Sequence, residues 1–106
     1  MTTIHKYSID NGLRHFHINA PIVKPLKIDY QYNDSPFLWA IVDTDKEPIE
    51  WLVTKCGTGW DFGALNACSL TVEAIDPNSY LNTTFEPGTP FVWHWFCRPL
   101  IRSVDL

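Results

Sequence analysis

The sequence lacks any run of basic residues. Lys and Arg number 8 against 12 Asp and Glu, which gives a formal net charge of −4 over 106 residues. Proteins that contact DNA or RNA directly usually carry a basic stripe that neutralises phosphates, so we expect no direct nucleic-acid binding. The acidic residues are scattered as well, and the loose group Asp43, Asp45, Glu47 and Glu50 is too sparse to mimic the charge of DNA.

Long hydrophobic runs are also missing. No window approaches the roughly 20 apolar residues of a membrane span. Residues 1–12 contain no apolar segment behind a basic start, as a secretory signal would. We therefore expect no membrane partner and a cytoplasmic location.

Cysteine is scarce. Cys56, Cys68 and Cys97 are odd in number, far apart in the sequence and set among apolar residues. This pattern indicates reduced thiols in the core rather than a disulfide framework.

The sequence contains no recognisable catalytic or metal-binding motif, such as Gly-x-Ser-x-Gly, Cys-x-x-Cys or His-Glu-x-x-His. His15 and His17 share one face of a strand, but a metal would need His5, His94 or a carboxylate to complete the set. His94 and Cys97 lie three apart, which places them on opposite faces of a strand and prevents a catalytic dyad. We expect no enzyme activity, no metal and no other cofactor.

Apolar residues are plentiful, at 45% of the chain with 14% aromatic. A chain of this length has enough apolar surface for one core. We predict a single β domain over residues 1–106, with residues 101–106 as the only detachable tail.

Short runs rich in Ile, Val, Phe, Tyr and Trp alternate with Pro, Gly, Asn and Asp, which is typical of consecutive antiparallel strands. The predicted fold class is mainly β: a compact antiparallel sandwich or a partly closed barrel of six to seven strands. At most one short helical turn is expected, within residues 61–68. Turns are predicted at Asn33–Ser35 and over residues 43–48. The expected strands are Ile4–Ile9, His15–Asn19, Pro25–Tyr32, Pro36–Asp43, Ile49–Cys56, Ser69–Ile75 and Phe91–Cys97.

Two of these strands are apolar on both faces. In residues 36–43, one face carries Phe37, Trp39 and Ile41, and residues 91–97 show a similar pattern. We expect residues 38–42 to be largely buried. A barrel-like closure or a homodimer would cover the second faces.

The string Gly57-Thr58-Gly59 is predicted to form a tight turn, with a ligand-binding loop as the less favoured alternative. Its spacing fits neither the dinucleotide fingerprint nor a P-loop. Most of the five tryptophans should lie in the core, but Trp60 beside this turn should be exposed, with few local packing neighbours. The candidate binding residues are Gly57, Thr58, Gly59, Trp60 and Asp61.

Several strings, taken in order, resemble a family of small uncharacterised proteins of tailed bacteriophages. They are Lys6-Tyr7, Ser35 to Asp43 with its Leu-Trp-Ala-x-Val-Asp core, Gly57-Thr58-Gly59, and Phe91 to Phe96 with its Phe-Val-Trp-His-x-Phe pattern. The chain departs from that family at Trp60, where His is common, and over residues 61–78, which resemble an extension without a counterpart.

The resemblance implies a phage-encoded accessory protein in the host cell cytoplasm. The favoured hypothesis is a non-catalytic binding protein that inhibits a host defence or metabolic component. Two alternatives stay open: an oligomeric sponge that sequesters a nucleotide signal, and a minor structural protein of the virion. The expected partners are accordingly a host protein or a small nucleotide ligand, with homodimer formation as a further possibility.

Because no disulfide is expected among Cys56, Cys68 and Cys97, reducing agent should leave the melting temperature almost unchanged. A native disulfide contributes about 2–4 kcal/mol, which would correspond to several degrees in a domain of this size. Thermal unfolding with and without dithiothreitol measures the difference. A fall of several degrees on reduction would contradict the prediction.

Overall fold

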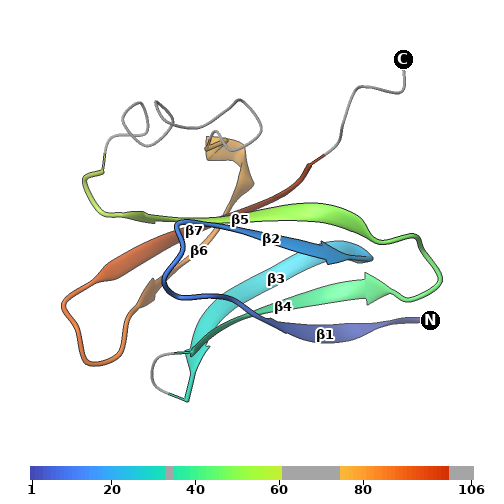
Figure 1. Cartoon of the computed structure of the whole chain (residues 1–106), viewed down its shortest axis with the longest axis horizontal. Helices are drawn as coiled ribbons and strands as arrows, with labels where there is room; N and C mark the ends of the chain where they lie inside the picture. The colour runs from blue at the N-terminus through green and yellow to red at the C-terminus, as the bar shows by residue number, and fades with distance from the viewer. Residues whose placement is uncertain (33–34, 61–74, 101–106) are drawn as a thin grey trace.

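The computed structural model describes residues 1–32, 35–60 and 75–100 and contains seven strands in this part of the chain (Figure 1). The 3-10 turn η2 (Pro77–Ser79) is capped by the Asp76 carboxylate, which accepts a hydrogen bond from the Asn78 N–H. The mainly β fold class is thereby confirmed. The strands are β1 (Thr2–Ser8), β2 (His15–Ala20), β3 (Ile22–Gln31), β4 (Ser35–Asp43), β5 (Ile49–Gly57), β6 (Tyr80–Phe85) and β7 (Val92–Pro99).

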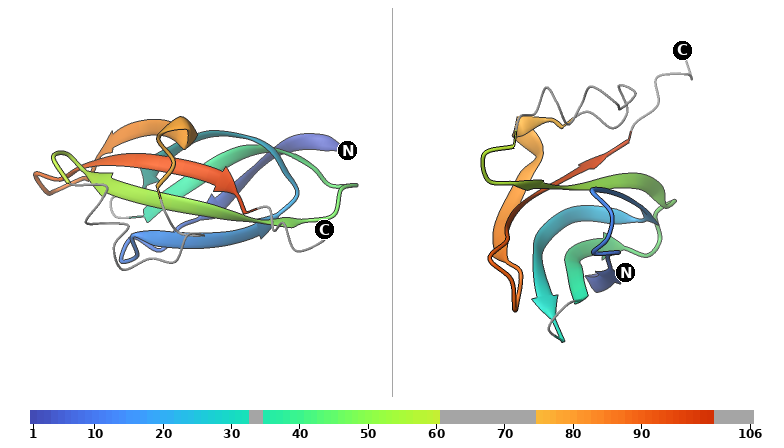
Figure 2. Two further views of the ribbon diagram at one scale, coloured as in Figure 1. Left: turned by 90° about the horizontal axis from the view of Figure 1, so that it is seen from above. Right: turned by 60° about the vertical axis from the view of Figure 1, so that its left-hand side comes forward.

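The strands form two antiparallel sheets, one in the order β1-β4-β3 and the other in the order β2-β5-β7-β6. The chain passes from one sheet to the other at Pro21, which separates β2 from β3. Figure 2 shows the strands curling around a common interior. The arrangement is thus a sandwich with barrel-like curvature.

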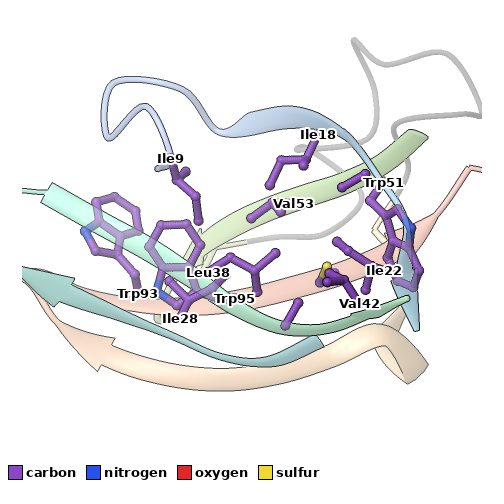
Figure 3. Close-up of a cluster of buried hydrophobic side chains, with 13 residues drawn as sticks. Ile9, Ile18, Ile22, Ile28, Leu38, Val42, Trp51, Val53, Trp93 and Trp95 are labelled. Carbon is purple, nitrogen blue, oxygen red and sulfur yellow. The ribbon is translucent and has the colours of Figure 1, made fainter. Parts of the chain in front are cut away.

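One core fills the space between the sheets (Figure 3). Trp95 is its largest fully buried side chain, and its Nε1 donates a hydrogen bond to the Thr84 hydroxyl at 2.7 Å. This bond satisfies the polar atom of the indole, so the ring can be buried without an unpaired donor.

Period-two alternation decides which side of β4 enters the core. Leu38, Ala40 and Val42 are completely buried between the sheets. Trp39 and Ile41 point to the other face and are only partly buried. The expectation that residues 38–42 are largely buried is confirmed in full for Leu38, Ala40 and Val42 and in part for Trp39 and Ile41, because the sheet packs against its neighbour through one face only.

Six of the predicted strands are confirmed with small shifts at their ends. The predicted hairpin is confirmed as β3–β4, and Tyr32 at its turn has a left-handed φ of 58°. Asn33, Asp34 and the helical turn expected within residues 61–68 lie outside the described residues.

The expected strand Ser69–Ile75 falls on residues 69–74, outside the described part of the chain, and Ile75 itself is not in a strand. The structure also contains β6, which the sequence did not indicate because its centre is the polar run Asn82-Thr83-Thr84. A strand with a polar centre does not show the alternation of apolar residues from which strands are predicted.

Cys56 and Cys97 are buried free thiols, as expected, whereas Cys68 lies outside the described residues. Burial raises the pKa of both thiols, that of Cys97 to about 12. A raised pKa disfavours the thiolate, which is the reactive form of cysteine.

The two sheets meet along β3 and β6, where Asn82 joins them. Its side-chain oxygen accepts a hydrogen bond from the Ile28 N–H at 3.0 Å, and its Nδ2 donates to the Ile28 carbonyl at 2.6 Å. One side chain thus satisfies both backbone groups of a fully buried residue. Asn82 takes the place of a strand neighbour along this seam.

Replacing Asn82 by Ala should lower the free energy of unfolding by about 2–4 kcal/mol, because two buried backbone groups lose their partners. Phe85→Ala on the same strand is the control, since Phe85 is 77% exposed. The control should change stability by at most about 0.5 kcal/mol. Urea unfolding of both variants tests this, and equal losses would contradict the assigned role of Asn82.

Candidate functional site

The Gly57-Thr58-Gly59-Trp60 segment forms a tight turn at the end of β5. The Trp60 N–H donates to the Gly57 carbonyl at 3.1 Å, and Gly59 has a φ of +84°, which L side chains rarely adopt. A Cβ on Gly57 would lie 2.7 Å from the Trp60 ring. Glycine at position 57 therefore lets the indole lie directly against the backbone.

Trp60 is 42% exposed, as expected, but it is not isolated. Its ring packs edge to face on Trp93, with centroids 5.4 Å apart, and Phe91 lies 5.7 Å from Trp93 on a tilted plane. The expectation of few packing neighbours is wrong, because β7 brings Trp93 beside the turn. We call Trp60, Trp93 and Phe91 the aromatic cluster.

A pocket lies on each side of the turn. The larger has a volume of about 360 Å³ and joins the turn to the β6–β7 hairpin, with Gly57, Thr58, Trp60, Pro90, Phe91, Val92 and Trp93 around it. The smaller has about 230 Å³ and is lined by Cys56, Gly57, Thr58, Gly59, Trp60, Tyr80, His94 and Phe96. Of the predicted residues, Gly57, Thr58 and Trp60 line both pockets, and Gly59 lines the smaller one.

A chain of hydrogen bonds borders the smaller pocket. His94 Nε2 lies 2.7 Å from the Thr58 hydroxyl, and its Nδ1 lies 2.9 Å from the Thr83 hydroxyl. The Thr83 hydroxyl is in turn 2.6 Å from the Tyr80 hydroxyl. Each hydroxyl can donate or accept, so this chain fits either tautomer of His94 and fixes its ring.

The described lining residues of both pockets include no Lys, Arg, Asp or Glu. These residues therefore offer no cation to bind a phosphate. They also offer no carboxylate to stabilise the positive charge that His94 would gain if it acted as a general base. What they offer is aromatic surface with a few neutral hydrogen-bonding groups. Such a surface suits binding of an apolar group.

A buried polar network holds Trp93 from beneath. Glu86 Oε1 accepts a hydrogen bond from Trp93 Nε1 at 2.9 Å, and the Lys55 ammonium lies 4.3 Å from the centroid of a Trp93 ring. Lys55 is only 6% exposed and donates to the Asn11 carbonyl and, at 3.4 Å, to Asn11 Oδ1. The Tyr30 hydroxyl bonds to Asn11 Oδ1 at 3.0 Å and to Glu86 at 3.3 Å.

The electrostatics of this network follow from burial and mutual contact. Burial lowers the pKa of Lys55, while the nearby negative charges of Glu86 and Asp10 oppose that shift. Burial disfavours ionised Glu86, but hydrogen bonds from Trp93, Asn11 and Tyr30 and the charge of Lys55 lower its pKa overall. Burial, and then the charge of Glu86, raise the pKa of Tyr30.

Sequence reasoning missed this network. Lys55 alternates with Trp51 and Val53 along β5, so period two alone would have placed it on the core side. Asn11 and Glu86 lie in connections, and nothing in their sequence context indicates that they meet.

A family model for a domain of unknown function, DUF7352, matches residues 1–102. The chain belongs to this family. Comparisons with curated proteins and with solved structures found no match. Membership of the DUF7352 family assigns no activity, so function has to be argued from geometry.

In this DUF7352 domain the four candidate metal-binding histidines have separate surroundings. His15 Nδ1 lies 3.1 Å from the Thr54 hydroxyl, His17 lies 3.2 Å from a Glu50 carboxylate oxygen, and His5 packs on Tyr7 in the other sheet. Within residues 1–32, 35–60 and 75–100, no group of three His, Cys, Asp or Glu side chains is placed to hold a metal.

The structure brings Gly57, Thr58, Gly59 and Trp60 together in one turn, whereas Asp61 lies outside the described residues. Over the described chain there is also no helix long and apolar enough to cross a membrane.

Glu86→Gln should lower the free energy of unfolding by about 1–3 kcal/mol near neutral pH, because a charge-assisted acceptor is lost. The folded-state pKa of Glu86 lies below its usual value. Its contribution is therefore present above about pH 4.5 and is lost as the pH falls through the lower folded pKa.

The difference between wild type and Glu86→Gln should accordingly shrink from about pH 6 to about pH 3, as measured by urea unfolding. Glu47→Gln, at an exposed turn position, is the matched control and should show a small, steady difference. A Glu86→Gln deficit of the same size at both pH values would contradict the proposed charge-dependent hold on Trp93.

Proposed function

We propose that this chain is a non-catalytic binding protein that grips a partner protein through the aromatic cluster. The observation that carries the proposal is the packing of the exposed rings of Trp60 and Phe91 on the buried Trp93, beside a pocket of about 360 Å³. Tryptophan is enriched among the residues that dominate binding energy at protein interfaces. The pocket beside the rings suits an apolar side chain from the partner.

The rings need little ordering on binding. Trp93 is fixed by Glu86 and Lys55, and the Trp60 ring is pressed between Gly57 and Trp93. A surface that is already ordered loses less side-chain entropy when a partner docks. This supports a recognition role for the cluster over a purely structural one.

The resemblance to small proteins of tailed bacteriophages gives the proposal its setting. In that setting the chain is a phage accessory protein in the host cytoplasm, and its partner is a host defence or metabolic protein that it inhibits. The role as a minor virion component has support from the resemblance alone.

A nucleotide sponge is less well supported. Trp60 offers a stacking surface and His94 with Thr58 offers hydrogen bonds, but the described lining lacks Lys and Arg. A multiply charged phosphate group would then go without a cationic partner. Native mass spectrometry of the protein purified from infected cells would reveal a retained nucleotide, and that result would replace the protein-binding proposal.

Photocrosslinking tests the proposal directly. A photoreactive phenylalanine analogue at position 60 should give a covalent adduct of defined mass in infected cells, whereas the same analogue at exposed position 47 should not. Adducts of equal yield at both positions, or none at position 60, would contradict it.

Phe91→Ala in the position-60 protein should reduce the adduct yield about tenfold, because loss of a central interface ring costs more than about 1 kcal/mol. Ile49→Ala is the matched control, since Ile49 is 43% exposed at the opposite end of β5. The control should keep the yield. Circular dichroism should show both variants folded.

A further inference from the structure

The outer face of the three-stranded sheet carries a second aromatic surface. The aromatic cluster belongs to the other sheet and to the turn that follows β5. Phe37, Trp39 and Ile41 alternate along its central strand β4 and are only partly buried. The aromatic rings form a continuous row. The centroids of Phe37 and Trp39 lie 6.2 Å apart, and Tyr32 packs edge-on against Phe37 at 6.5 Å. The apolar surface extends onto β1 through Ile4, which is 58% exposed.

Lysines from both edge strands surround this surface. The strand register places Lys6 of β1 and Lys27 of β3 on either side of Trp39, and Lys24 of β3 beside Ile41. These are three of the eight Lys and Arg residues of a chain whose net charge is −4. Three lysines therefore flank an apolar centre on an acidic protein, and Asp29 of β3, which pairs with Phe37, is an acidic residue of the same face.

The lysine ammonium groups lie over the rings. Lys6 Nζ is 4.7 Å from the Phe37 centroid. The same ammonium group reaches across β4 and donates a hydrogen bond to Oε1 of Gln31 on β3 at 2.9 Å. Lys27 Nζ is 5.3 Å from the Trp39 centroid and 3.8 Å from Asp29 Oδ2. Flexible exposed side chains hold these positions, so an incoming anion can draw the ammonium groups away and leave the rings free for contact.

A second copy of the chain fits this surface poorly. A two-fold interface places the same patch on both subunits. Centred on Trp39, it would bring Lys6 and Lys27 of each copy against those of the other, and opposed like charges at an interface cost several kcal/mol.

A single-stranded nucleic acid is also less favoured. Its bases could stack on Trp39 and Phe37, but binding would rest on three lysines against Asp29 and a net charge of −4. The aliphatic part of the surface, formed by Ile4, Ile41 and the 47% exposed Val23, suits protein side chains.

We infer that the outer face of β1, β4 and β3 docks a protein segment that is apolar at its centre and carries carboxylates at its rim. Trp39 supplies the central contact, and Lys6, Lys24 and Lys27 pair with the carboxylates. This surface is independent of the aromatic cluster, because it lies on the other sheet and shares none of its residues.

A short peptide of alternating Glu and Leu serves as the probe, with a peptide of alternating Lys and Leu as the charge control. In a titration followed by backbone amide NMR shifts, the Glu-Leu peptide should move signals of β1, β3 and β4 and leave those of the β6–β7 hairpin in place. Lys27→Glu should weaken its binding about tenfold. Lys46→Glu, which makes the same charge change at an exposed turn, should keep the affinity within about twofold.

Both lysines are exposed, so neither substitution removes a core contact, and circular dichroism should confirm the fold. Equal weakening by the two variants, equal binding of the two peptides, or shifts that map to the other sheet would overturn the inference. Tighter binding of a deoxythymidine oligonucleotide on this face would assign it to nucleic acid instead. A dimer detected by sedimentation and broken by Lys27→Glu would assign it to a second copy.

Discussion

The hold of Lys55 and Glu86 on Trp93 connects the core of this protein to its proposed binding surface. Placing an ammonium group where only 6% of the residue is exposed costs free energy unless its charge and protons are matched. Here the matching comes from the Asn11 carbonyl and side chain, the face of Trp93 and the charge of Glu86. Because each partner comes from a different part of the chain, the β1–β2 connection, β5 and the β6–β7 hairpin are fixed together.

Because these segments are fixed together, the glycine turn at residues 57–60 can hold the large ring of Trp60 in one position. Trp60 has almost no support from its own turn beyond Gly57, whose missing Cβ lets the indole approach the backbone. Among the described residues, Trp93 also supports the ring and is itself held by the partly buried network of Glu86 and Lys55. The position of the exposed Trp60 ring therefore depends, through Trp93, on the partly buried pair of Lys55 and Glu86.

The strands β2, β3, β4, β5 and β7 could be predicted because each carries apolar or aromatic residues at period two, and β1 could be predicted from a short run with Ile4 and Tyr7 before the turn residues Asp10 to Gly12. β6 was not predicted, because its inward-facing residues are polar. Asn82 bonds to Ile28 at the seam between the sheets, and Thr84 bonds to Trp95 in the core. For the site, glycine chemistry was enough to place Gly57 and Gly59 in a turn. The contacts of Trp60 and the pairing of Lys55 with Trp93 depend on strand register, which local sequence does not specify.

The same limit applies to the outer face of the three-stranded sheet. Double-sided apolar alternation in residues 36–43 indicated an apolar outer face on β4, but Lys6, Lys24 and Lys27 come from separate segments and meet only through the register of β1 and β3 on β4. The two surfaces differ physically as a result. In the proposed roles, the aromatic cluster is ordered before contact and would mainly lengthen the lifetime of a complex, whereas the exposed lysines would act over distance and mainly raise the rate of encounter. A partner that engaged both sheets would need an apolar side chain for the pocket beside Trp60 and an acidic rim for the face around Trp39.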